Sequence, residues 1–201
     1  MKISVRAETL QRFATLYKSL EPNASDEIKC LRLELSTGKI VLVGSNQYVA
    51  CAELIGESQQ ADEVCYIKLD DESVEVINKE VEIGGYFNIE TLPELAISTV
   101  TNSENHVCNN FIIWNKNHVY DKWRKWFSIS EESEGFMYCT LYQIQSLFET
   151  SPSGEIVFPE NLNSKEPVLI RDVNSDKWIG AFIPAYDGRK VLKPSNLPEW
   201  F

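Results

Sequence analysis

The chain has 201 residues, 43% of them hydrophobic, and a formal net charge of −11. This composition is typical of a soluble globular protein with a real core. The charge argues against a surface that is basic throughout, although it leaves room for a local basic face. No apolar run of about 18 residues occurs, and the start MKISVRAETL has no apolar signal segment, so we expect a cytoplasmic protein without a membrane span. The five cysteines include no CxxC pair, so we expect no disulfide framework.

The first 56 residues predict a strand, a helix and three further strands. Residues 2–5 alternate as a strand does. Apolar side chains then recur at helical spacing, namely Leu10, Phe13, Ala14, Tyr17 and Leu20. The turns Thr37-Gly38 and Gly44-Ser45-Asn46 separate three apolar runs. We expect these runs to form an antiparallel sheet, with strands at 30–35, 40–43 and 48–55.

Residues 136–186 predict the same order of elements. FMYCTL is the expected strand and Leu141–Thr150 the short helix, with Thr140 as its N-cap. Three strands follow at GEIVF, EPVLIRDVN and KWIGAFIPA. Two copies of one unit must bury their apolar faces against each other. We therefore predict an α+β fold with antiparallel sheets, built from a first repeat at 1–56 and a second repeat at 136–186.

The middle section, residues 65–134, fits neither copy. We expect strands at 64–69, 74–77 and 111–114, a short helix at 89–97 and a polar loop at 102–110. The predicted organisation is a single domain at 1–186, with an inserted β-rich section at 57–135 and a C-terminal tail at 187–201.

Three segments carry a resemblance to a known family: the opening MKISVRAETLQRFATLYKSL, then LRLELSTGKIVLVGSNQYVACAELI, and finally KEPVLIRDVNSDKWIGAFIPA. They resemble a DNA polymerase sliding clamp, most closely the bacterial DNA polymerase III beta subunit. The resemblance implies a DNA-clamp (processivity) fold in which two β-α-β-β-β copies are related by a pseudo-twofold axis. In that fold the helices line a central hole and the sheets form the outside of a ring.

The resemblance also implies a function. Clamps encircle duplex DNA and tether polymerases, without catalysis and without a cofactor. On this chain it implies phosphate contacts from Arg6, Arg12 and Lys18, around the first helix. The second helix has no Lys or Arg. A ring of this family needs six such domains, so a single-domain chain would act as a homo-oligomer.

The segment YDKWRKWF at 120–127 interleaves basic and aromatic residues. This pattern suits base stacking with phosphate contact, or contact with a partner through Trp123 and Trp126. It equally suits an amphipathic edge, with Trp123, Trp126 and Phe127 turned inward and Lys122 and Lys125 outward. We favour the amphipathic edge.

The chain ends in NLPEWF. Clamp-binding peptides contain a leucine followed by a pair of aromatic or apolar residues. Leu197, Trp200 and Phe201 have that spacing, but Pro194 stands where the usual leading glutamine would be. Such a tail either folds back on its own domain or docks onto a partner, which would be a neighbouring copy, a polymerase or another clamp component.

No group of residues predicts catalysis or a metal site. His106, Cys108 and His118 do not have a known zinc spacing, and nothing suggests a third group that would orient a Cys–His pair. We therefore expect a protein that is not an enzyme and binds no metal or cofactor. Two hypotheses remain. The first is a replication accessory protein that tethers on DNA as an oligomer. The second is an interaction protein that binds or mimics replication proteins without encircling DNA.

Overall fold

The computed structural model describes residues 1–20, 23–92, 97–114, 116–117, 119–127, 137–138, 141–158, 167–182 and 185–186. Within them, three segments each follow the order β-α-β-β-β. Unit 1 contains β1 (Lys2–Arg6), α1 (Ala7–Lys18), β2 (Cys30–Ser36), β3 (Lys39–Ser45) and β4 (Val49–Glu57). These are the five elements predicted for the first repeat.

Unit 2 lies in the middle section. It contains β5 (Glu63–Lys68), α2 (Asp71–Glu82), β6 (Tyr86–Leu92), β7 (Ile97–Thr101) and β8 (Ile112–Trp114). The expectation that this section fits neither copy was therefore wrong, as were the strand at 74–77 and the helix at 89–97. The strands at 64–69 and 111–114 are confirmed within a residue at each end.

Unit 3 is the predicted second repeat. It contains β9 (Met137–Tyr138), α3 (Leu141–Thr150), β10 (Ile156–Val157), β11 (Val168–Asp172) and β12 (Trp178–Phe182). A further strand, β13 (Ala185–Tyr186), pairs with β9. A 3-10 helix, η2 (Trp123–Phe127), precedes this unit.

Units 1 and 2 are joined by two strand pairs, in each of which the first strand of one unit pairs with the second strand of the other. The first strand of unit 1 pairs with the second strand of unit 2, because β1 runs antiparallel to β6 with Lys2 opposite Glu90. The reverse pair is also present, since β2 runs antiparallel to β5 with Leu33 opposite Cys65. This reciprocal pairing gives the two units an approximate twofold relation. The pseudo-twofold partner of unit 1 is thus the supposed insertion, and not residues 136–186. The outer boundaries of 1–186 and 187–201 stay a prediction.

Units 1 and 3 are joined in another way. Their last strands pair, with β12 antiparallel to β4 and Gly180 opposite Cys51. The result is an eight-stranded sheet in the order β10-β11-β12-β4-β3-β2-β5-β8, beside a three-stranded sheet β1-β6-β7. This junction between units 1 and 3 positions the site described below.

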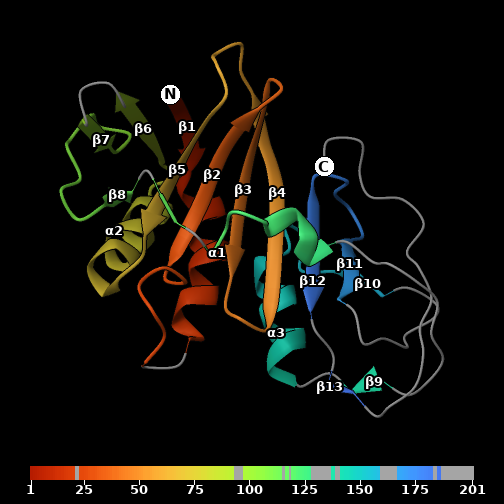
Figure 1. Cartoon of the computed structure of the whole chain (residues 1–201). Helices are drawn as coiled ribbons and strands as arrows, with labels where there is room; N and C mark the ends of the chain where they lie inside the picture. Colours follow the sequence, from red (N-terminus) through yellow and green to blue (C-terminus); the bar gives the residue numbers. More distant parts are fainter. Residues whose placement is uncertain are drawn as a thin grey trace.

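The large sheet is covered on both faces. Helices α1 and α3 lie behind it, and the turn of η2 lies in front, over β4 and β12 (Figure 1). Two separate apolar clusters correspond to these faces. One contains Leu10, Phe13 and Leu16 of α1, and the other contains Tyr120, Trp123 and Phe127 from the η2 segment. Because both faces are buried, β3 is apolar almost throughout instead of alternating.

Candidate functional site

The junction of units 1 and 3 is fixed by polar contacts beneath the helices. The Arg12 guanidinium donates to both carboxylate oxygens of Glu53, at 3.0 and 3.1 Å, and to the Thr150 carbonyl at 2.6 Å. Burial raises the pKa of Glu53, while its hydrogen bonds from Arg12 act in the opposite direction. Arg12 therefore connects α1, β4 and the end of α3.

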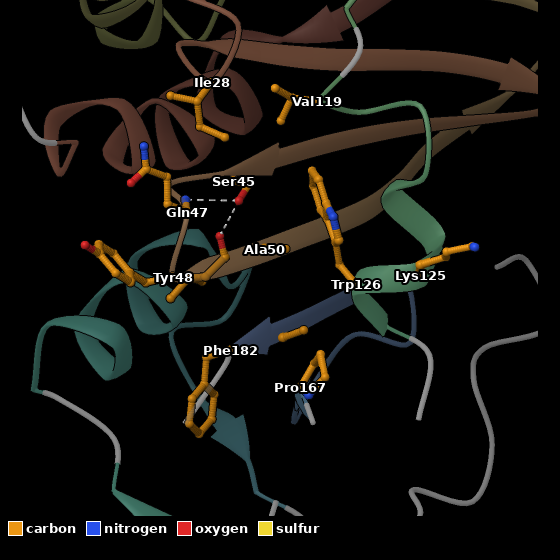
Figure 2. Close-up of a pocket in the computed structure, with 12 residues that line it drawn as sticks. Ile28, Ser45, Gln47, Tyr48, Ala50, Val119, Lys125, Trp126, Pro167 and Phe182 are labelled. Carbon is orange, nitrogen blue, oxygen red and sulfur yellow. Dashed lines mark hydrogen bonds between the residues drawn. The ribbon is translucent and has the colours of Figure 1, made fainter. Parts of the chain in front are cut away.

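An apolar pocket of about 330 Å³ opens on the other face of the same junction. Strand β4 and the turn before it form one wall, the η2 segment forms a second, and β12 with Pro167 forms the floor (Figure 2). Its lining is mostly apolar: Ile28, Tyr48, Val49, Ala50, Val119, Trp126, Pro167, Ala181 and Phe182, with Ser45, Gln47 and Lys125.

The turn between β3 and β4 is held rigidly. The Asn46 side chain accepts hydrogen bonds from the backbone N–H groups of Tyr48 and Val49, at 3.2 and 2.9 Å. Its amide nitrogen donates to Ser19 at 2.9 Å and to the Tyr142 hydroxyl at 3.2 Å. One buried amide thus fixes the pocket wall to both α1 and α3. Pockets that bind with specificity are usually preformed in this way.

The opposite wall is anchored through η2. Trp126 packs against Tyr120, with ring centroids 5.3 Å apart, and faces the cavity (Figure 2). Tyr120 is itself fixed, because its hydroxyl accepts from the Ser45 N–H at 3.2 Å and donates to the Cys30 carbonyl at 2.6 Å. Lys125 also belongs to the pocket lining, but its exposed amine points outward, away from the cavity (Figure 2). The site is therefore an apolar hollow with one positive charge outside its edge.

The face of the molecule that carries α1, α2 and α3 is charged, unlike the apolar pocket. Arg6 and Lys18 are exposed at the two ends of α1, as a phosphate contact would require. The exposed charges on the three helices are nevertheless mostly acidic: Glu8, Asp71, Glu72, Glu75, Glu82 and Glu149, against Lys18 and Lys79. Lys79 is paired with Glu75. An acidic face repels the DNA backbone, so it is a weak candidate for a phosphate-binding surface.

The predicted site residues are separated by the fold. Arg12 was expected to contact phosphate, but its guanidinium forms an ion pair with Glu53 inside the protein. Trp123 is buried, and its indole donates to Glu34 at 2.9 Å, so it packs instead of meeting a partner. Trp126 lines the pocket. Leu197, Trp200 and Phe201 lie outside the described residues, as does His118.

The amphipathic interpretation of 120–127 is confirmed. Trp123 and Phe127 are buried, Trp126 is half-buried, and Lys122 and Lys125 are exposed. Sequence reasoning missed the residues that complete the pocket, above all Asn46 and Phe182. The motif Gly44-Ser45-Asn46 was recognised as a turn, but nothing in it signals that Asn46 contacts two helices.

The described part of the chain offers little for catalysis. It holds no cluster of three or more His, Cys, Asp or Glu residues able to bind a metal ion. Burial raises the pKa of Cys30, Cys51 and Cys65 to about 12, so these thiols stay protonated at neutral pH and are poor nucleophiles. No helix among these residues has the length and apolar character needed to cross a membrane.

The fold is that of the DNA polymerase sliding clamps. The chain superposes on a putative DNA polymerase III beta subunit from Eubacterium rectale with a TM-score of 0.53, at 11% identity, over 93% of this chain and 65% of that one. The sliding clamp of Pseudomonas aeruginosa, solved with a ligand, superposes with a TM-score of 0.56 at 10% identity, over 92% of this chain and 66% of that one. The clamp of Bacillus subtilis superposes with a TM-score of 0.55 at 9% identity, over 93% of this chain and 64% of that one.

These likenesses concern the fold alone, since the identities are so low. The chain spans slightly less than two thirds of the length of each of these three clamps. No protein-family model matches the chain, and no curated protein matches it.

Proposed function

We propose that this protein is a non-catalytic, cytoplasmic interaction protein of the clamp fold that acts in DNA replication by binding a partner peptide in the pocket between units 1 and 3. The observation that carries the proposal is the contrast between the two faces. A rigid apolar pocket lies on the face of the sheet that carries η2, while the face that carries the helices is acidic.

The pocket chemistry indicates the kind of partner. Its walls are large apolar groups such as Trp126 and Phe182, which suit one or two aliphatic or aromatic side chains. Lys125 at the rim suits an acidic residue beside them. The chain's own C-terminal NLPEWF has this composition. We propose that Leu197, Trp200 and Phe201 dock in this way onto a neighbouring copy or another clamp-fold protein. Support by analogy comes from the Pseudomonas aeruginosa clamps, which have been solved with a ligand and bound to griselimycin.

A labelled peptide with the sequence of residues 194–201 tests the pocket. The full chain should bind it saturably in a fluorescence anisotropy titration. Trp126→Ala should raise the dissociation constant about 30-fold, since losing an aromatic anchor typically costs about 2 kcal/mol.

Trp114→Ala is the matched control. Trp114 is also half-buried, but it lies on β8, outside the pocket, and packs on Lys68. The control should bind like the wild type. Equal weakening by both substitutions, or no binding by the wild type, would count against the pocket.

A second candidate is tethering on DNA as an oligomer, through Arg6 and Lys18. The exposure of both side chains beside α1 favours it. If this function holds, Lys18→Glu should weaken binding of a labelled duplex and lower its salt dependence by about one counterion. Glu149→Gln, on the neighbouring helix, should strengthen binding instead. Our first proposal expects only weak duplex binding that neither change alters.

A further inference from the structure

Unit 3 lacks the kind of partner that units 1 and 2 provide for each other. In units 1 and 2, each first strand pairs with the second strand of the other unit. In unit 3, the second strand β10 pairs only with β11 among the described residues and forms the edge of the eight-stranded sheet (Figure 1). The first strand β9 pairs only with the short β13. Both strands are left with an open edge in the part of the chain described, and an open edge is a template for pairing.

Helix α3 carries an apolar stripe on the side facing away from α1. Tyr142 and Thr150 face α1, through the contacts with Ser19 and Arg12. Leu141, Ile144 and Phe148 follow at i, i+3 and i+7, so they lie on the opposite side of the helix. Leu141 is 80% exposed and Phe148 is 41% exposed. Exposed apolar groups that follow one side of a helix in this way mark an interaction surface.

The geometry of units 1 and 2 shows what fits such a surface. Gln11 donates to Asn78 at 2.9 Å and Tyr17 donates to Asp71 at 3.2 Å, so α1 and α2 run antiparallel. An antiparallel helix pair flanked by reciprocal strand pairs has twofold symmetry. The unit that completes unit 3 is therefore another β-α-β-β-β unit, related to it by a twofold axis.

We propose that unit 3 pairs with unit 3 of a second copy of this chain, forming a twofold dimer in which α3 packs antiparallel on its partner. The other two units already complete each other, so the described part of one chain offers no spare unit. A twofold contact satisfies both surfaces at once. The charges permit it, because Glu149 is the only charged residue of α3 and lies away from the centre of the stripe.

Mass in solution tests the dimer. Multi-angle light scattering across a concentration series should give twice the 23.0 kDa of one chain. Leu141→Glu and Phe148→Glu should each shift the mass toward 23.0 kDa, because they place a carboxylate in the contact. Neither side chain is fully buried, so circular dichroism should show an intact fold. Val107→Glu is the control, since Val107 is 59% exposed on unit 2 and should leave the dimer unchanged.

A cross-link tests the axis itself. In an antiparallel pair centred on this stripe, residues 144 and 145 lie beside their own copies. In a Cys139→Ser background, Gln145→Cys should form an intermolecular disulfide and Gln60→Cys should not. A monomeric wild type would overturn the proposal and would leave the pocket proposal untouched. So would a dimer that survives both glutamate substitutions, because the dimer would then form elsewhere.

Discussion

Glu34 is the residue that holds η2 on the sheet. Its buried carboxylate accepts hydrogen bonds from Trp123 at 2.9 Å and from Arg32 at 2.9 Å, and it pairs with Arg124 at 2.7 Å. Arg124 also lies over the Trp123 ring, 4.4 Å from its centre. One carboxylate thus fixes the basic and aromatic residues of η2, and with them the Trp126 wall of the pocket.

The pH dependence of stability should report this contact. Burial acts to raise the pKa of Glu34, but the hydrogen bonds from Arg124, Trp123 and Arg32 outweigh it and hold the pKa below its usual range. A lowered pKa means that the charged form is favoured in the folded state. Its stabilisation is therefore present above the ordinary Glu pKa of about 4.3 and is lost as the pH falls through the lower folded value.

Glu34→Gln should then lower the free energy of unfolding by about 3 kcal/mol near neutral pH, because it leaves buried arginine charge unpaired. The difference from the wild type should shrink as the pH falls below about 4. Urea unfolding at several pH values measures both. Glu75→Gln, in the exposed pair with Lys79, should change little. A pH-independent difference at Glu34 would contradict this account.

The sequence predicts which residues face inward along one element, but it does not predict which distant residue each of them contacts. The sequence correctly placed Trp123 and Phe127 inward and Lys122 outward, because amphipathic spacing is local. Helical spacing likewise puts Arg12 on the side of α1 opposite its apolar residues. It could not show that this side faces Glu53 from a strand 41 residues away. A polar helix side adjoins either water or another polar surface, and spacing alone does not distinguish the two.

At the scale of elements, three small residues in register allow the helices to approach the sheet. Gly44 of β3 and Gly180 of β12 both lie opposite Cys51 of β4. A Cβ atom at Gly44 would lie 2.9 Å from Leu16 of α1, and one at Gly180 would lie 2.5 Å from Leu147 of α3. This row therefore sets how closely α1 and α3 pack at the junction.

Gly180→Ala should destabilise the protein by about 2 kcal/mol, because the added methyl overpacks the contact with Leu147 and Trp178. Gly56→Ala is the control in the same sheet, where a Cβ would lie 3.5 Å from Ile40. It should be neutral or slightly stabilising, since alanine restricts the unfolded chain. Urea unfolding of both variants measures the difference. Equal effects would mean that the junction has room to adapt.

The two elements predicted wrongly each had a signal of the correct structure. In α2, Val74, Ile77 and Val81 recur at helical spacing, and Asp70 forms a capping box with Ser73. The alternation of SVEVI favoured a strand and hid that spacing. In β6, the side chains of Phe87, Ile89 and Thr91 are buried at every second position, as strand spacing requires. The helix expected at 89–97 did not take account of that spacing.

At the scale of the whole molecule, the fold class followed from the repeat, but the grouping of the units did not. The tails of units 1 and 3 are alike in sequence, which predicted that they pair as one domain. The structure instead pairs unit 1 with unit 2 by strand exchange and with unit 3 through last strands. Resemblance between two segments shows that they fold alike. It does not show which surfaces they share.

The same arrangement explains why the candidate site was not predicted. The pocket combines a turn of unit 1, the η2 segment and a strand of unit 3, which lie far apart in the sequence. Its position on the η2 face of the sheet and the acidic face of the helices are the two features on which we base the proposal of partner binding. Both features depend on which face of the sheet each segment covers.

The central claim is that the pocket between units 1 and 3 binds a partner peptide. An amide NMR titration of the labelled full chain with the peptide of residues 194–201 tests it most directly. We predict saturable shifts at the amides of the pocket lining, notably Val49, Ala50 and Ala181, with little change along α1. Shifts confined to the helical face, or none at a large excess of peptide, would contradict it.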